Sequence, residues 1–174
     1  MSPELDRALC EAHPRILRNY RRDIRARVKL WGFECADGWH GIVSSLCVLV
    51  DAPYTQARQH YEELVAWRAM PSGQPQRVVS DDEVLRAQRK MVMAERNVPI
   101  VALVKVNFGA LRIQMESEDA RTTALIEFAE HHSRSVCEEC GAPGRLREGA
   151  WPRTLCDAHA ARTCPPHEPT CAVT

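Results

Sequence analysis

Three cysteines and one histidine near the end of the chain constrain its fold more than any other feature. Cys137 and Cys140 are separated by two residues, fifteen residues follow before Cys156, and two more precede His159. A two-residue gap lets one tight turn direct two side chains at the same ion, and the whole spacing is close to that of zinc ribbons. We therefore predict a zinc knuckle at residues 137–160, with these four residues as ligands.

The residues between the ligands predict a short segment held by the metal. Gly141 directly follows the second cysteine, where such a turn often needs a positive φ. Pro143, Gly144 and Gly149 mark turns that leave room for at most a very short hairpin. Four protein ligands complete a tetrahedron, so we predict a structural Zn²⁺ rather than a catalytic one. A catalytic zinc with an open position is the alternative, and it applies if His159 is not a ligand.

Charge around the predicted zinc knuckle is the next constraint. Three thiolates and one neutral imidazole around Zn²⁺ leave the site about one unit negative. We expect arginines that are close in sequence to offset this charge: Arg134, Arg145, Arg147 and Arg153.

The tail, residues 161–174, contains further residues of the metal-binding types. Three of them form a candidate second metal site: Cys164, His167 and Cys171. His131, His132 or a partner chain would have to complete that site. Three prolines in the same segment favour the other interpretation, a disordered end with incidental ligand types.

The composition and charge of the chain argue against some classes of binding partner. The chain of 174 residues has 23 Lys and Arg against 23 Asp and Glu, so it lacks a general attraction to nucleic acid or membrane. The N-terminus lacks the basic start and apolar stretch of a signal peptide, and no apolar run approaches the roughly 18 residues of a membrane span. We therefore expect a cytoplasmic protein whose 8 cysteines are reduced. Cys10, Cys35 and Cys47 are expected to be core thiols.

Hydrophobic periodicity predicts a helical first half of the chain. A helix is expected after Ser2, and Pro14 would end or kink it. A second helix is expected to be capped by Asp37 and to run to about Val50. Pro53 would open a separate third helix, with five residues facing inward: Tyr54, Ala57, Tyr61, Leu64 and Val65. A capping box of Ser80 and Glu83 predicts the start of a fourth helix.

From residue 99 on, apolar and polar residues alternate, which predicts a β-hairpin near residues 99–116 with one buried face and one solvent-exposed face. A helix is expected at residues 119–133, with Ala124, Leu125, Phe128 and Ala129 inward. The sequence therefore predicts an α+β fold. Residues 1–136 would form one domain, with a helical N-terminal part and a hairpin packed with a helix, and the zinc knuckle and the tail would follow.

A basic segment, Arg15–Lys29, is the strongest feature outside the zinc knuckle. Its spacing predicts an amphipathic helix, and five arginines form a candidate face for nucleic acid or a partner: Arg15, Arg18, Arg21, Arg22 and Arg25. The alternative is a solvated helix face balanced by acidic residues elsewhere, which the net charge of zero favours.

Three stretches carry a family resemblance. They are L-W-G-F-E-C-A-D-G-W-H-G-I at residues 30–42, V-K-V-N-F-G-A-L-R-I at 104–113, and C-E-E-C-G-A-P-G with W-P-R-T-L-C-D-A-H within 137–159. Together they resemble an uncharacterised family of small phage and prophage-borne bacterial proteins, whose members carry a G-x-E-C-x-D-G-W motif, a V-K-E-K-F-G-G-L-R-F hairpin and a cysteine-rich end. The resemblance implies the metal site and a phage protein in the cytoplasm of a bacterial host.

The chain departs from the family pattern in its hairpin, which reads V-N-F-G-A where E-K-F-G-G is usual. Residues 50–97 are longer than usual, and the tail beyond His159 is an addition. The sequence contains no catalytic triad and no phosphate-binding glycine loop. We therefore predict a non-enzymatic, zinc-stabilised binding protein that contacts a bacterial host or defence protein as an inhibitor or adaptor. A nucleic-acid-binding protein that uses the basic segment beside the zinc knuckle is the alternative, and the oligomeric state stays open.

Overall fold

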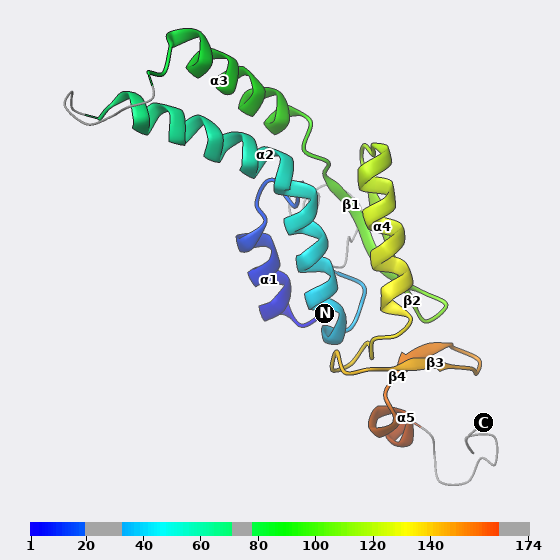
Figure 1. Ribbon diagram of the computed structural model, residues 1–174. Helices are drawn as coiled ribbons and strands as arrows, with labels where there is room; N and C mark the ends of the chain where they lie inside the picture. Colours follow the sequence, from blue (N-terminus) through cyan, green and yellow to red (C-terminus); the bar gives the residue numbers. More distant parts are fainter. Residues whose placement is uncertain (20–32, 71–77, 164–174) are drawn as a thin grey trace.

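The structure, a computed structural model, describes residues 1–19, 33–70 and 78–163, and it has the predicted α+β architecture (Figure 1). Five α-helices, one 3₁₀ helix and two antiparallel hairpins are found in these ranges. In chain order they are α1 (Pro3–Ala12), η2 (Asp37–Trp39), α2 (His40–Arg68), α3 (Asp81–Arg96), β1 (Val101–Asn107), β2 (Ala110–Met115), α4 (Ala120–Ser133), β3 (Arg145–Arg147), β4 (Arg153–Leu155) and α5 (Asp157–Thr163).

Helix α1 ends before Pro14, as predicted, but the basic segment does not begin as a helix. Residues 14–19 form turns, and Ile16 and Leu17 are buried within them. The carbonyl of Ile16 accepts a hydrogen bond of 3.0 Å from the backbone N–H of Val101, which ties this turn to the start of β1. The predicted amphipathic helix is therefore wrong for residues 15–19, and its remainder lies outside the described residues.

Helix α2 is one helix of 29 residues, not the two that Pro53 led us to expect. A proline inside a helix removes the N–H that would bond to the carbonyl four residues earlier, here Leu49. The guanidinium of Arg121 in α4 donates to that carbonyl at 2.7 Å and so replaces the missing donor. The helix changes direction about midway along its length (Figure 1), the usual effect of an interior proline.

The start of α2 also differs from the prediction. The carboxylate of Asp37 makes no cap hydrogen bond to the helix but accepts one of 2.6 Å from the backbone N–H of Ser2. The turn η2 leads into α2 instead. By contrast, the capping box of Ser80 and Glu83 is present as predicted and starts α3.

Strands β1 and β2 form the predicted hairpin, with Asn107 paired to Ala110. The two-residue turn between them needs positive φ at both positions, and Phe108 and Gly109 have φ values of 48° and 73°. A short bridge widens the sheet on the other side of β1, where Glu34 pairs in parallel with Lys105.

Helix α4 lies along the free edge of β2 and supplies hydrogen-bond acceptors to it. The N–H of Leu111 donates to the hydroxyl of Ser133, and the N–H of Ile113 donates to the carboxylate of Glu130, both at 2.9 Å. An exposed strand edge invites association with other chains, and side chains that satisfy its N–H groups remove that liability.

The buried face of α4 matches the prediction at Ala129 and in part at Leu125, but not at Ala124 and Phe128. Its buried residues are Thr122, Ile126, Ala129 and Ser133, whereas Phe128 is 66% exposed and Ala124 is exposed. Leu125 is partly buried against the core. The edge contacts with β2 rotate the helix away from the face that hydrophobicity alone favours.

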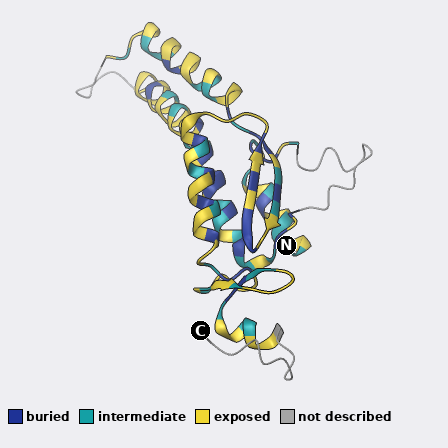
Figure 2. Cartoon of the chain, turned by 90° about the vertical axis from the view of Figure 1, so that its right-hand side faces the viewer, coloured by how far each residue is buried: buried dark blue, intermediate teal, exposed yellow. Residues whose placement is uncertain are grey.

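The core lies where the first half of α2 meets the β1–β2 hairpin and α4 (Figure 2). Trp39, Cys47 and Val104 are each 0% exposed at its centre. The second half of α2 and α3 are mostly exposed (Figure 2). Among the described helices, none is both long and apolar enough to cross a membrane.

Candidate metal centre

The structure brings the four predicted ligands together. One sulfur or nitrogen from each of Cys137, Cys140, Cys156 and His159 lies within 4.8 Å of all the others. The sulfurs of Cys140 and Cys156 are 3.9 Å apart, and the Nδ1 of His159 lies 3.7 Å from the sulfur of Cys137 and 3.1 Å from that of Cys156. Metal–sulfur bonds of about 2.3 Å in a tetrahedron place neighbouring ligand atoms about 3.7 Å apart, so this donor set fits one metal ion.

Local structure explains how the ligands converge. The turn from Cys137 to Gly141 closes through a 2.9 Å hydrogen bond between their carbonyl and N–H groups, and Gly141 has a φ of 75°, as predicted. Strands β3 and β4 form the very short hairpin that returns the chain to Cys156. Helix α5 begins at the next residue and carries His159 in its first turn.

The backbone of the knuckle also favours a thiolate at Cys137. Burial opposes ionisation of this buried thiol, but hydrogen bonds from the backbone N–H groups of Cys156, Cys140 and Glu139 outweigh it, and the pKa of Cys137 is lowered. A thiolate is the form that binds a metal.

Three of the four arginines expected to offset the negative site are paired with carboxylates of the knuckle itself. Arg145 and Arg147 contact Asp157, and the Arg147 hydrogen bond lowers the pKa of that carboxyl group. Arg153 contacts Glu138 and Glu139, and the Glu138 side chain is only 5% exposed. The arginines therefore neutralise acidic residues that flank the ligands. The fourth, Arg134, is exposed.

The G-x-E-C-x-D-G-W stretch packs directly on the ligand turn. A Cβ at Gly38 would lie 2.2 Å from the carbonyl oxygen of Cys137, so only glycine fits there. The N–H of Gly38 donates to the carbonyl of Glu138, and the indole N–H of Trp39 donates to the carbonyl of Val136, both at 2.8 Å.

The turn of the β1–β2 hairpin contacts the knuckle from another side. A Cβ at Gly109 would lie 2.5 Å from the Cδ1 of Leu146 and 3.1 Å from the backbone of Pro152. The hydroxyl of Thr154, which is 0% exposed, donates to the carbonyl of Gly109 at 2.6 Å. The three stretches that carry the family resemblance therefore meet at the metal centre, although they are far apart in the sequence.

Other predicted site residues are not part of this centre. Cys164, His167 and Cys171 lie outside the described residues, as does most of the predicted disordered tail. His131 and His132 are exposed, and the His132 ring stacks on Phe128 with centroids 5.9 Å apart. Neither histidine belongs to a second group of metal-binding side chains among the described residues.

The basic segment is divided between described and undescribed residues. Arg15 forms an ion pair with Asp51 and lies over the ring of Tyr54, 4.2 Å from its centroid. The Asp51 hydrogen bond raises the pKa of Arg15. Arg18 is exposed. Arg21, Arg22 and Arg25 lie outside the described residues.

The expected core thiols are largely as predicted. Cys35 and Cys47 are buried, and burial raises the pKa of Cys35 to about 11 and that of Cys47 to about 12. Cys10 is half-buried. Sequence reasoning missed a contact between the Nε2 of His13 and the hydroxyl of Ser44, which are 3.1 Å apart. Burial lowers the pKa of His13, which favours its neutral form. No local motif joins these two residues, because 31 positions separate them.

No protein-family model, curated protein or solved structure matches the chain. The family resemblance in the three stretches therefore stays a prediction.

Proposed function

We propose that this is a non-enzymatic, zinc-stabilised binding protein that acts by contact with another protein. The observation that carries the proposal is the cluster of Cys137, Cys140, Cys156 and His159, whose four donor atoms lie within 4.8 Å of one another. Four protein donors around a tetrahedral ion leave no position for water or substrate. Bound Zn²⁺ would supply folding energy to the knuckle. A Cys₃His donor set is typical of zinc, because soft thiolates select it over harder cations.

A surface beside the metal centre supports the choice of a protein partner. It consists of Phe108, Leu146 and Trp151, which are 80%, 49% and 87% exposed, and we call it the aromatic surface. These residues come from the β1–β2 turn, from β3 and from the β3–β4 turn, which meet around Gly109. Exposed aromatic side chains grouped in this way are typical of protein–protein interfaces, where they act as anchors.

The kind of partner follows from the family resemblance. A phage or prophage protein in a bacterial host would act on a host or defence component, as an inhibitor or adaptor. The nucleic-acid alternative is less well supported, because Arg15 is already paired with Asp51. The net charge of zero also provides no general attraction to phosphates.

Affinity capture from a bacterial lysate tests the proposal. We expect the wild-type chain to retain a protein partner that a Phe108→Ser, Trp151→Ser double variant does not retain. Val78→Ser is the matched control, because Val78 is 90% exposed before α3 and lies outside the aromatic surface. Equal capture by all three proteins would show that the partner does not use this surface.

Two further assays separate the alternatives. A gel shift that weakens steeply with salt would support nucleic-acid binding instead, since phosphate contacts release counterions. Metal-dependent turnover of a nucleotide, a peptide or a nucleic acid would overturn the non-enzymatic role.

A further inference from the structure

The second half of α2 and all of α3 form an antiparallel pair of helices that extends from the core (Figure 1), and we call it the helical arm. The arm comprises residues 54–70 and 81–96. Its two helices bury few side chains between them, chiefly Tyr54, Leu64 and Ala87. A pair of helices is a single layer, so a side chain outside their shared seam stays in solvent unless something else covers it.

Large apolar side chains are exposed on this arm. Trp67, Met70 and Met93 are 44%, 46% and 54% exposed. Trp67 lies in the last turn of α2, and Met70 lies two residues beyond the end of that helix. Met93 follows Lys90 by three residues on α3.

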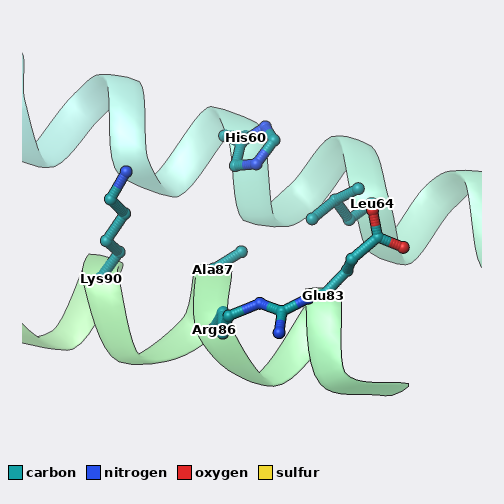
Figure 3. Close-up of a pocket in the computed structure, with 6 residues that line it drawn as sticks. All are labelled: His60, Leu64, Glu83, Arg86, Ala87 and Lys90. Carbon is teal, nitrogen blue, oxygen red and sulfur yellow. The ribbon is translucent and has the colours of Figure 1, made fainter. Parts of the chain in front are cut away.

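A groove of about 520 Å³ lies between the two helices of the arm (Figure 3). It is lined by His60 and Leu64 of α2 and by Glu83, Arg86, Ala87 and Lys90 of α3. His60, Arg86 and Lys90 form the basic end of the groove. None of these three basic side chains has an ion pair or a side-chain hydrogen bond within the described ranges 1–19, 33–70 and 78–163.

Acidic residues lie one helical turn nearer the tip of the same face. Asp82 precedes Arg86 by four residues, which places it on the same side of α3. Glu63 follows His60 by three residues on α2, and Glu83 lines the groove itself. The face therefore carries an acidic end, Glu63, Asp82 and Glu83, followed along the arm by the basic end.

This order of charges is complementary to itself. Consider a two-fold axis perpendicular to the arm that passes between the acidic end and the basic end. It places the acidic end of each copy over the basic end of the other copy. Two-fold interfaces between identical chains have this reciprocal form. Trp67 follows the groove residue Leu64 by three residues on α2, so the dimer would also shield this exposed side chain from water.

We propose that the groove face of the helical arm binds the same face of a second copy of this chain, with the two arms antiparallel. The product is a four-helix arrangement that buries what one pair of helices leaves exposed.

The area of the groove face sets the expected strength of the dimer. Helix α3 has 16 residues and is therefore about 24 Å long, and two helices side by side are about 20 Å wide. The face then covers about 500 Å² per copy, or about 1,000 Å² in total, which is near the lower limit for a specific interface. We expect a weak dimer that dissociates on dilution. It should also dissociate as salt rises, since the screening length falls from about 10 Å at 0.1 M to about 3 Å at 1 M.

Reciprocal charge reversal in the full chain tests this proposal, with molar mass measured by light scattering or sedimentation. An Arg86→Glu, Lys90→Glu variant makes most of the face acidic, with only His60 of the basic end unchanged, and a Glu63→Lys, Asp82→Lys variant makes most of it basic. Each variant alone is expected to be monomeric at concentrations where the wild type is dimeric. An equimolar mixture of the two is expected to restore a one-to-one dimer, because most of the charged contacts become favourable again.

Arg58→Glu, Arg96→Glu is the matched control, because it makes the same change in net charge with two residues that do not line the groove. It is expected to leave the dimer intact. Circular dichroism establishes that each variant keeps its helices, and salt titration of the wild type gives a second measurement that needs no variant. A wild type that stays monomeric, a dimer that survives either groove variant, or folded variants that do not pair when mixed would each overturn the proposal.

Discussion

At the residue scale, two glycines allow segments distant in sequence to lie against the metal-binding turn. A side chain at Gly38 would overlap the backbone of Cys137, Cys140 and Gly141, and one at Gly109 would overlap Leu146. Backbone atoms of the ligand turn cannot move without displacing the ligands. The requirement at Gly38 is therefore a steric one, because its own φ does not lie in the left-handed region.

We expect Gly38→Ala to lower the free energy of unfolding by about 1–3 kcal/mol, the usual cost of forcing extra atoms into a packed site. The matched control is Gly41→Ala, where an added Cβ would meet nothing within 4 Å. That substitution is expected to stabilise α2 by about 0.5–1 kcal/mol, since alanine loses less entropy in a helix. Denaturant unfolding of both variants measures the difference. If the two substitutions had equal effects, the close approach at Gly38 would not exist.

At the element scale, the helices differ in what holds them. Helix α4 is fixed to β2 by hydrogen bonds that Glu130 and Ser133 accept in its last turn, and it packs into the core. Helix α3 buries only Ala87 fully and depends on its capping box. Elements with few buried contacts open locally, at a lower free energy than the whole protein.

Backbone amides of α3 are therefore expected to exchange with solvent faster than those of β1 and β2. Ser80→Ala removes the cap and should cost about 1 kcal/mol, which raises the exchange rates of α3 amides about fivefold. Native-state hydrogen exchange followed residue by residue measures both effects. The amides of α4 serve as the internal control, because Asp119 caps that helix separately. If the Ser80→Ala substitution instead raised amide exchange rates uniformly across the protein, α3 would unfold only together with the whole protein.

At the scale of the whole molecule, the segment that carries the candidate metal centre is attached to a conventional hydrophobic core. The core joins α1, α2, the β1–β2 hairpin and α4, and its buried cluster includes Trp39 but none of the four ligands. The knuckle contributes few buried apolar side chains of its own, such as Leu155. We therefore expect the core to stay folded without metal while the knuckle loses its structure.

We expect about one zinc per chain, and its removal by a strong chelator should lower the melting temperature. Cys137→Ser should have the same effect, since it removes a buried ligand. A loss of about 3 kcal/mol corresponds to roughly 6–12 °C for a chain of this size. Cys10→Ser is the control, because Cys10 is half-buried and is not a ligand. Melting followed by circular dichroism and metal analysis provide the measurements. Equal melting temperatures with and without the chelator would contradict a structural metal.

The sequence by itself determined the features whose causes are local. Ligand spacing predicted that the four residues of the candidate metal centre lie together, and the tight turn predicted the positive φ of Gly141 from its neighbouring residues alone. The capping box of α3 and the alternation that predicted the β1–β2 hairpin are local for the same reason.

Only the tertiary structure decided the features that depend on distant partners. Pro53 lies inside one long helix because Arg121 supplies the missing donor, and Phe128 is exposed because α4 turns another face to β2. Arg15 pairs with Asp51, and Gly38 and Gly109 are required because the knuckle packs on both. These contacts join positions far apart in the chain. Periodicity and spacing describe only a residue's neighbours in sequence, so neither could predict them.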